Sequence, residues 1–584
     1  MCYLAEAQVD HNQLAPGTDN DIDENITPEI ELESSDSEDG EGWREGDLQE
    51  VLFTEDPHFT VPDVMKKPVE YFQYYFDNEL IAMIANETNL YTTQKTGKSI
   101  CVTPEEILSF FGIMIYMGVC SLPAARDYWD SDSYIPQVSA VMSRDRYKLI
   151  HANIHFHNNE DKGDDRLLKI RPLLNHMRTK CHGLEQEYQL SVDERMEGYK
   201  GCRAGSLRQY MPDKPSSRFG FKLFVLAAKS GMTHDFIPYT GQDTFAGENL
   251  TDQEKQLGVG AMAVIALCKS VTNPKCTTVT FDNYYTGIPL ITHLRDKMDL
   301  YSVGTIKRCR TRQCPLTDGK KCMKQGRGTY ESRVNKNAIV IVQWADNKPV
   351  CLASSFVGAG PAGSMKRYSK EAHGKIDVPC PRAVAVYNQT MGGVDLSDMY
   401  MAMYKIPTRA KRWYFAFIGY SLELALTNSW LQYKRDCKLL QTPKKETIPN
   451  SKKFRLQVSE GLRSLLLRSH GQPSLDNSLT KKKIRRPMVC RPNDTLRTDG
   501  YGHLPEHCKK GRCRYCKDGT SRIMCSKCET VLCLNLDRNC FAQFHVTQKG
   551  RLVSKDKEEN QEETDGSGAE ENVDDDLLDL ELEN

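Results

Sequence analysis

The sequence predicts a multi-domain protein of the α+β class with a zinc module near its C-terminal end. Apolar residues recur at helical spacing through residues 68–185, and strand-like and helix-like segments follow through residues 187–307. Seven of the 21 cysteines then fall between Cys508 and Cys540. Strands followed by alternating helices and strands are typical of a mixed sheet with helices packed on it. A chain of 584 residues has room for about three or four such domains.

The helical part is predicted to form a domain over residues 59–186. The segment PVEYFQYYFDNELIAMIANETNLY, which begins at Pro68, has apolar residues at helical spacing. Thr103-Pro104-Glu105-Glu106 is a typical helix start, and it precedes an apolar run over residues 107–119. This run is shorter than the ~20 residues that a membrane span needs, so we expect a buried helix and no membrane association.

The strand-like part is predicted to be the first half of a sheet domain over residues 187–307. Residues 187–194, EYQLSVDE, have the pattern of a strand that ends in two acids, and residues 221–229 and 236–241 have the pattern of the next two strands. Two helix-like segments then alternate with two strand-like segments; they are a helix at 259–271, a strand at 277–283, a helix at 287–298 and a strand at 301–307.

The remaining chain completes the predicted domain layout. Residues 308–383 are rich in Gly, Lys, Arg and Cys and interrupt the alternation, so we expect an inserted domain there, and helices resume over residues 384–435. A basic helical or linker region follows at residues 436–499, and the zinc module at residues 500–548. The basic run KKKIRR at residues 481–486 is typical of a nuclear import signal, which predicts a nuclear protein.

Charge is distributed very unevenly along the chain. Residues 1–50 hold 16 acidic residues and one basic residue, and residues 551–584 hold 14 acidic and three basic residues. The residues between them therefore hold 73 basic against 49 acidic residues, a net charge of +24 within a chain of net charge −2. This basic body predicts a polyanionic partner. We expect the acidic segments 1–58 and 549–584 to be disordered, because they cannot bury enough apolar surface to fold.

The N-terminal sequence argues for an intracellular environment. MCYLAEAQVDHN has neither the basic start nor the apolar core of a secretory signal. We therefore expect the cysteines to be reduced.

Four aspartates are candidates for a catalytic metal site. Asp193 and Asp282 each follow an apolar or β-branched run, at the carboxyl end of a predicted strand, where open sheets place their ligands. Asp395 and Asp398 are one helical turn apart and face one direction. Converging carboxylates suit two-metal phosphoryl transfer, with two Mg²⁺ or Mn²⁺ ions as cofactors. The alternative is that these aspartates serve turns and helix caps.

The cysteine-rich module is predicted to bind two structural zinc ions. Two CxxC pairs are followed by a lone cysteine and a Cys-x4-His unit; the ligands are Cys513, Cys516, Cys525, Cys528, Cys533, Cys540 and His545. These are seven of the eight ligands that two zinc ions need, and His503, His507 and Cys508 are the candidates for the eighth. Alternating pairs would form a cross-brace, in which either His503 or Cys540 joins Cys533. Disulfides are the alternative, and an intracellular environment disfavours them.

Three sequence blocks resemble the piggyBac family of cut-and-paste transposases. They are SVDERMEGYKGCRAGSLRQYMPDKPSSRFGFKLFVL, TFDNYYTGIPLI and YNQTMGGVDLSDMYMAMY. KRWYFAFIGYSLELALTNSW is similar to the helix that follows, and ILSFFGIMIYMGVCSLPAARDYW and DRLLKIRPLL are similar to the helical dimerisation and DNA-binding region of the family. The resemblance covers residues 68–548 in the order that the family has.

The resemblance implies a fold and a reaction. The fold is an RNase H-like catalytic core of the DDE class with an inserted domain, and Asp193, Asp282 and Asp395 match the metal-binding triad, with Asp398 in a supporting role. The reaction is nicking at transposon ends, hairpin formation and joining at TTAA targets. The implied partners are double-stranded DNA with inverted repeats and a second copy of the chain, with no small-molecule cofactor. The competing hypothesis is a domesticated DNA-binding or chromatin protein without transposition activity.

The resemblance also bears on ligand and DNA contacts. His503 lies where the family has a histidine, so it is preferred as the eighth zinc ligand, and the zinc module is expected to bind the inverted repeats. Trp413 aligns with an aromatic residue that steadies the DNA end, with ordinary helix packing as the alternative. Six basic residues are expected to hold phosphates, with a solvated charged face as the alternative; they are Lys214, Arg218, Lys222, Arg308, Arg310 and Arg312.

Overall fold

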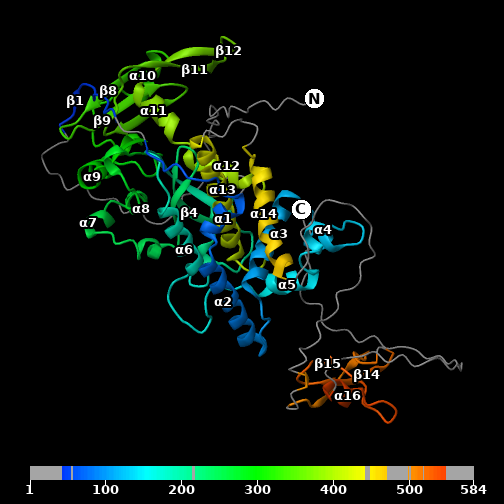
Figure 1. Cartoon of the computed structure of the whole chain (residues 1–584). Helices are drawn as coiled ribbons and strands as arrows, with labels where there is room; N and C mark the ends of the chain where they lie inside the picture. Colours follow the sequence, from blue (N-terminus) through cyan, green and yellow to red (C-terminus); the bar gives the residue numbers. More distant parts are fainter. Residues whose placement is uncertain are drawn as a thin grey trace, which may run out of the picture. The chain divides into compact units, whose positions relative to one another are not determined.

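The computed structural model describes residues 42–53, 57–212, 218–408, 410–440, 448–469, 497–498, 502–516 and 518–546. These residues belong to two compact units, one within residues 1–475 and the other within residues 476–584 (Figure 1). Lys214, the basic run at 481–486, most of the predicted acidic leader and the C-terminal acidic segment lie outside the described residues. Among the described helices, none has the length and apolar character of a membrane span.

The first unit begins with the helices that the sequence predicts. They are α1 (Pro68–Tyr75), α2 (Asn78–Thr96), α3 (Pro104–Val119), α4 (Pro136–Ser139), α5 (Arg144–Asn153) and α6 (Arg171–His182). Helix α3 starts with a capping box, in which Thr103 and Glu106 each accept the backbone N–H of the other. Its apolar run is buried against α14 (Ser451–Ser469), where a side chain at Gly112 would come within 2.9 Å of Arg463.

The centre of the unit is a ten-stranded mixed sheet. Its strand order is β1-β8-β9-β10-β7-β6-β2-β4-β3, and β5 pairs with β4. The strands are β1 (Arg44–Glu45), β2 (Gln189–Gly198), β3 (Gln209–Tyr210), β4 (Phe219–Ala228), β5 (Thr233–Pro238), β6 (Thr278–Phe281), β7 (Tyr301–Thr305), β8 (Tyr330–Val334), β9 (Val340–Ala345) and β10 (Pro349–Ser354). Strands β2, β6 and β7 run parallel, and the other neighbours are antiparallel.

Helices connect the parallel strands and cover the sheet. They are α7 (Asp252–Lys255), α8 (Val259–Cys268), α9 (Ile288–Met298), α11 (Arg382–Thr390), α12 (Gly393–Ala402) and α13 (Phe415–Leu439). Helix α13 is buried over most of its length and packs against both β2 and α1, so it joins the helical part to the sheet (Figure 1).

The segment predicted as an insertion continues the sheet. Strand β10 pairs antiparallel with β7, and β9 and β8 follow outward. On the other side of β7, Gly304 allows close packing against β6 and the segment after it, because an added side chain would lie 2.3 Å from the Thr286 hydroxyl. The segment also holds α10 (Gly319–Lys324) and a separate hairpin of β11 (Gly363–Ser369) and β12 (Gly374–Cys380) at the same end of the unit as α11 (Figure 1).

Residues 42–53 form an N-terminal strap on the outer part of the sheet, which corrects the prediction of a disordered leader through residue 58. Strand β1 pairs with β8, and the Asp47 carboxylate accepts the N–H groups of residues 359 and 360 at 2.7 Å each. Glu50 forms an ion pair with Arg382 at 3.0 Å. Phe53 packs against Phe356. Leu48, Val51 and Phe53 are spaced among the acids and are partly buried against the outer part of the sheet, which the acidic composition of the segment concealed.

Within its described residues, the second unit has a small three-stranded antiparallel sheet and one short helix. The elements are β13 (Pro505–Arg512), β14 (Thr520–Cys525), β15 (Thr530–Val531) and α16 (Cys540–Val546). Its core consists largely of cysteines, with Leu532, Phe541 and Phe544 as the buried large apolar residues.

Candidate active site and candidate metal centres

The parallel pairing of β2 with β6 brings Asp193 and Asp282 side by side. The last pair in the register is Val192 with Phe281, and the two aspartates follow directly. Neighbouring strands lie about 4.8 Å apart, so the two carboxylates share the carboxyl end of the parallel part of the sheet. Asp193 does not end its strand, however, because β2 stays paired with β4 as far as Gly198.

Helix α12 places Asp395 over this end of β2. Gly393 begins the helix, and a side chain there would lie 2.5 Å from the Ala228 carbonyl oxygen and 2.6 Å from the Ser191 hydroxyl. Only glycine permits so close an approach of helix to strand. Ser191 and Asp193 lie on the same face of β2, since side chains alternate along a strand. Asp395, in the first turn of α12, is therefore brought to the face that carries Asp193.

Tyr387 on α11 lies close enough to all three carboxylates for their charges to act on its hydroxyl. Its side chain is partly buried, and this burial raises the pKa of the Tyr387 hydroxyl well above its ordinary value. The charges of Asp282, Asp193 and Asp395 raise that pKa further, while a hydrogen bond with Thr305 at the end of β7 lowers it. No sequence motif singles out this tyrosine, because its surroundings depend on how α11 packs against β2, β7 and β10.

Asp282 lies in an anionic environment. Burial raises the pKa of its carboxyl group, and the charge of Glu194 raises it further. The Tyr284 N–H, which donates to Asp282 at 2.9 Å, and the nearby Lys222 ammonium lower that pKa. Lys222 also lies over the Tyr284 ring at 4.7 Å. Several carboxylates around one ammonium group form a donor set that fits hard divalent cations such as Mg²⁺.

Glu194 is a further acid at this site. It projects from the opposite face of β2 and accepts a hydrogen bond from the Tyr285 hydroxyl at 3.0 Å. The sequence motifs contain both Glu194, next to Asp193, and Tyr285, shortly after Asp282. Only the pairing of β2 with β6 shows that these two motifs meet.

Asp398 is held by an ion pair. The Arg195 guanidinium donates to its carboxylate at 2.5 Å, and the Arg195 side chain is 7% exposed against 33% for Asp398. Asp395 and Asp398 lie one turn apart on α12 and repel each other, and Arg195 is the basic partner that offsets this repulsion.

The predicted phosphate-binding residues divide into several environments. Arg310 donates to the carbonyl oxygens of Asn283 and Tyr284, both at 3.0 Å, so it braces the loop after Asp282. Arg308 donates to two carbonyl oxygens of its own segment, at residues 316 and 317. Lys222 lies beside Asp282, as described above, and Arg218 and Arg312 have exposed side chains.

Trp413 lies at the start of α13 in an aromatic cluster. Its ring centroid is 6.0 Å from those of Phe221 and Phe417 and 5.9 Å from that of Tyr414. Trp413 is partly buried and packs against Phe221 of β4 as well as against α13, and its contact with a DNA end stays a prediction.

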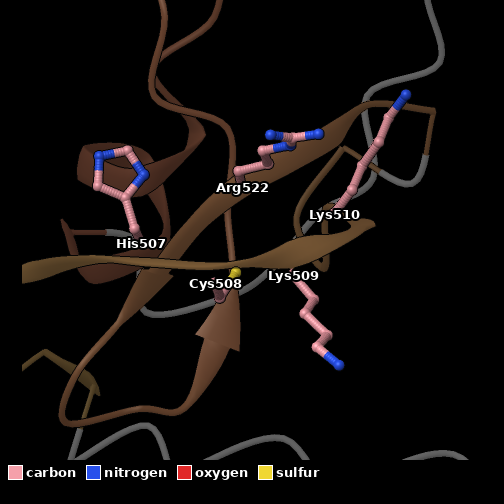
Figure 2. Close-up of a pocket in the computed structure, with 5 residues that line it drawn as sticks. All are labelled: His507, Cys508, Lys509, Lys510 and Arg522. Carbon is pink, nitrogen blue, oxygen red and sulfur yellow. The ribbon is translucent and has the colours of Figure 1, made fainter. Parts of the chain in front are cut away.

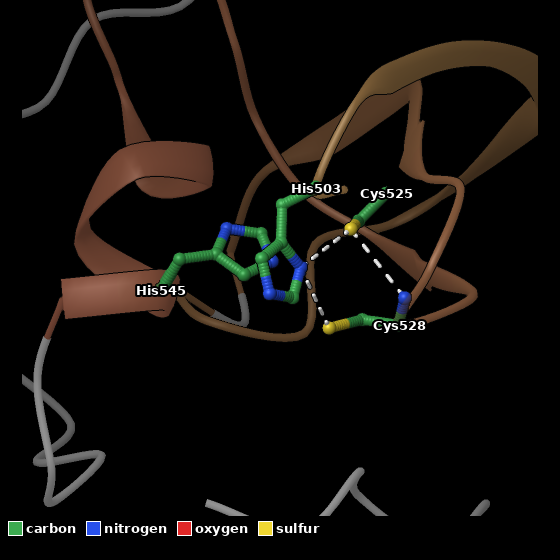
Figure 3. A group of neighbouring side chains, drawn as sticks. All are labelled: His503, Cys525, Cys528 and His545. Carbon is green, nitrogen blue, oxygen red and sulfur yellow. Dashed lines mark hydrogen bonds between the residues drawn. The ribbon is translucent and has the colours of Figure 1, made fainter. Parts of the chain in front are cut away.

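The eight predicted zinc ligands form two groups of four in the second unit. Within each group the ligand atoms lie within 4.8 Å of one another; the first group is Cys513, Cys516, Cys533 and Cys540, and the second is His503, Cys525, Cys528 and His545. Figure 3 shows the second group, where His503 Nδ1 lies 3.3 Å from the Cys525 sulfur and 3.4 Å from the Cys528 sulfur. Cys540 therefore joins Cys533, and His503 joins the second CxxC pair. The two groups interleave along the chain, as a cross-brace requires.

The rival ligands His507 and Cys508 lie outside both groups. They are on β13 and line a surface pocket together with Lys509, Lys510 and Arg522, the last from β14 (Figure 2). His503 lies before β13, in the loop that reaches the Cys525–Cys528 turn. His507 and Cys508 lie on β13 itself, and the strand places them away from the metal-ligand positions.

Comparison with known proteins places the chain in a family. Residues 67–430 match the family model described as Transposase IS4. The human PiggyBac transposable element-derived protein 3 is 30% identical over 517 residues, which cover 86% of this chain and 81% of that protein. The human PiggyBac transposable element-derived protein 2 is 32% identical over 396 residues, which cover 65% of this chain and 64% of that protein.

A solved structure has a similar fold. The cryo-EM structure of a piggyBac transposase synaptic complex with hairpin DNA matches with a TM-score of 0.58 at 22% sequence identity, over 82% of this chain and 97% of that chain. At this identity the likeness concerns the fold. Because the family model spans more than half of the chain, the chain belongs to the piggyBac-type DDE transposases, a family of enzymes that cleave and transfer DNA strands.

Proposed function

We propose that this protein is a cut-and-paste DNA transposase whose active site is built from Asp193, Asp282 and Asp395 in an RNase H-like core. The proposed reaction nicks transposon ends, forms hairpins and joins the element to TTAA targets. The observation that carries this proposal is the arrangement of β2, β6 and α12, which brings the three aspartates to the end of the parallel strands.

The residues of the site have separate tasks in this reaction. The three aspartates supply short, anchored oxygen ligands of the kind that Mg²⁺ and Mn²⁺ prefer. When bound, two such ions make a water or a 3′-hydroxyl nucleophilic and stabilise the leaving oxygen. Lys222 supplies positive charge for a phosphate beside Asp282, and Arg310 fixes the loop that follows this aspartate.

The other parts of the chain support a DNA-bound, nuclear enzyme. We assign one structural Zn²⁺ to each ligand group of the second unit, because four Cys and His ligands without an open position are typical of structural zinc. The zinc module is proposed to bind the inverted repeats, with the basic body holding phosphates and a second copy of the chain completing a homodimer. The basic run at 481–486 is proposed to direct the protein to the nucleus.

An end-cleavage assay tests the proposal. Full-length protein is incubated with Mg²⁺ and DNA that carries the inverted repeats flanked by TTAA. Asp282→Asn keeps the side-chain shape and removes the charge, so nicking should fall at least about 100-fold. DNA binding should stay near the wild-type value because affinity comes from the basic body. Asp299→Asn is the matched control, since Asp299 is exposed in a left-handed conformation that asparagine also adopts.

Two outcomes would contradict the proposal in different ways. Full nicking by Asp282→Asn would overturn the active-site assignment. Tight, repeat-specific binding by a wild-type protein that does not nick would instead support a domesticated DNA-binding protein.

A further inference from the structure

A partly buried ion pair joins the strand and the helix that carry two of the proposed metal ligands. Arg195 lies two residues after Asp193 on β2, and Asp398 lies three residues after Asp395 on α12. The guanidinium donates to the Asp398 carboxylate at 2.5 Å. Arg195 itself is 6% exposed. The bond therefore connects the two elements close to the proposed catalytic carboxylates.

Helix α12 is fixed to β2 at two points on one face of the strand. Ser191, Asp193 and Arg195 share that face because side chains alternate along a strand. The first fixed point is the contact of Gly393 with Ser191, and the second is the ion pair of Asp398 with Arg195. Asp193 lies between the two points on the strand, and Asp395 lies between them on the helix. Fixing both ends of this stretch sets the position of one aspartate relative to the other.

The arginine is itself held in place. Glu197, the next residue on the same face, lies 3.4 Å from the Arg195 guanidinium and accepts an ion pair from Lys405 at 2.9 Å. The Tyr420 ring of α13 covers the guanidinium at 5.3 Å. Arg195 and Lys405 thus balance the charges of Glu197 and Asp398. A planar guanidinium held on several sides keeps its fork in one orientation, which a lysine ammonium cannot do.

We propose that Arg195 is a positioning residue for catalysis, which acts through Asp398 to hold Asp395 opposite Asp193. This inference rests on the proposed function of the three aspartates as metal ligands. It also separates the two acids of α12: Asp395 faces the metal site, whereas Asp398 is neutralised by arginine and anchors the helix. Outer partners of metal ligands typically change metal affinity about 10- to 100-fold when they are removed.

The first measurement is the Kd for Mn²⁺ binding to zinc-loaded full-length protein. The electron paramagnetic resonance signal of free Mn²⁺ monitors the binding. Arg195→Gln should raise the Kd about tenfold or more, because Asp395 loses its fixed position. Arg195→Lys should recover part of the loss, since it keeps the charge and loses the fork. The Asp398 side chain is 33% exposed and stays hydrated in these variants, and the buried Glu197 keeps its ion pair with Lys405, so the protein should fold.

The matched control breaks a comparable ion pair elsewhere on the sheet. Arg178 on α6 binds Asp235 on β5 at 2.7 and 2.9 Å, and Asp235 is buried. Arg178→Gln should lower the thermal unfolding midpoint and leave the Kd for Mn²⁺ within twofold of wild type. An equal loss of Mn²⁺ affinity in Arg178→Gln would overturn the inference, because the effect would then be general destabilisation.

Non-additivity tests whether Arg195 acts through Asp398. Asp398→Asn should weaken Mn²⁺ binding about as much as Arg195→Gln, and the double variant should be no weaker than either single variant. Independent, multiplicative losses would overturn the inference, as would wild-type affinity in Arg195→Gln. If Asp282→Asn leaves Mn²⁺ binding unchanged, the proposed metal site itself fails, and the inference fails with it. If Mn²⁺ binding is lost in Asp282→Asn but unchanged in Arg195→Gln, only the inference about Arg195 is overturned and the proposed metal site stands.

Discussion

Lowering the pH from 8 to 7 should weaken zinc binding more at the all-cysteine site of the zinc module than at the second site. The two ligand groups differ in composition, since one has four thiols and the other has two thiols and two imidazoles. Zinc binds the thiolate, and a free thiol with a pKa of about 8.5 is mostly protonated in this range. Histidine, with an ordinary pKa of about 6.5, is already mostly neutral. Zinc binding must therefore displace about four protons at one site and about two at the other.

The difference in affinity follows from this count of protons. Each displaced proton changes the apparent affinity about tenfold per pH unit, or about 1.4 kcal/mol. The all-cysteine site should weaken by about 10⁴ between pH 8 and 7, and the mixed site by about 10². Burial and the neighbouring thiols raise the pKa of Cys533 to about 12, so zinc binding must displace a whole proton from this cysteine. Burial acts in the same direction at Cys516, but the Gly519 N–H and neighbouring thiols lower its pKa to about 7, so the exponent lies between three and four.

Chelator competition at pH 8, 7.5 and 7 measures these slopes. Cys525→Ser removes a ligand of the mixed site, so the remaining zinc affinity should show the steep pH dependence of the all-cysteine site. Cys516→Ser removes a ligand of the all-cysteine site and should leave the shallow pH dependence of the mixed site. Cys508→Ser is the control, because Cys508 lies on β13 outside both groups, and it should retain two zinc ions and both slopes. Equal slopes in the two ligand variants would refute the division of ligands, and one zinc per wild-type chain would refute the pair of sites.

Two further predictions concern the first unit. Deleting residues 1–41 should leave the thermal unfolding midpoint of this unit unchanged in differential scanning fluorimetry. Deleting residues 1–53 should lower the midpoint by several degrees, because the packing of Phe53 and the hydrogen bonds of Asp47 are lost. Equal midpoints for the two deletions would contradict a stabilising strap. Burial lowers the pKa of His155 to about 4, so the unfolded chain binds more protons and stability should fall as the pH drops from about 6.5 to 4. Urea unfolding should show about 2 kcal/mol lost between pH 7 and 5 from this residue, a loss that His155→Gln should remove; an unchanged pH dependence in that variant would refute this assignment.

Local features of the fold could be predicted from the sequence because they depend on neighbouring residues. The capping box at Thr103 and the apolar period of the run after it determine where α3 begins and that it is buried. The β-branched run before Asp282 predicts β6, and the spacing of the CxxC pairs identifies most of the zinc-ligand candidates. In each case the deciding contacts lie within a few positions along the chain.

The arrangement of the sites depends on contacts between distant residues, so only the tertiary structure decides it. Asp193 and Asp282 become neighbours because β2 and β6 pair in the register that joins Val192 to Phe281, and no local pattern specifies a strand register. The grouping of His503 with the Cys525–Cys528 turn, and not with Cys533, depends on where β13 begins relative to that turn. Arg195 resembles any charged strand residue in the sequence, and its ion pair with Asp398 exists only because α12 folds back onto β2. Residue chemistry limits what each side chain can do, whereas strand order and helix docking determine which side chains act together.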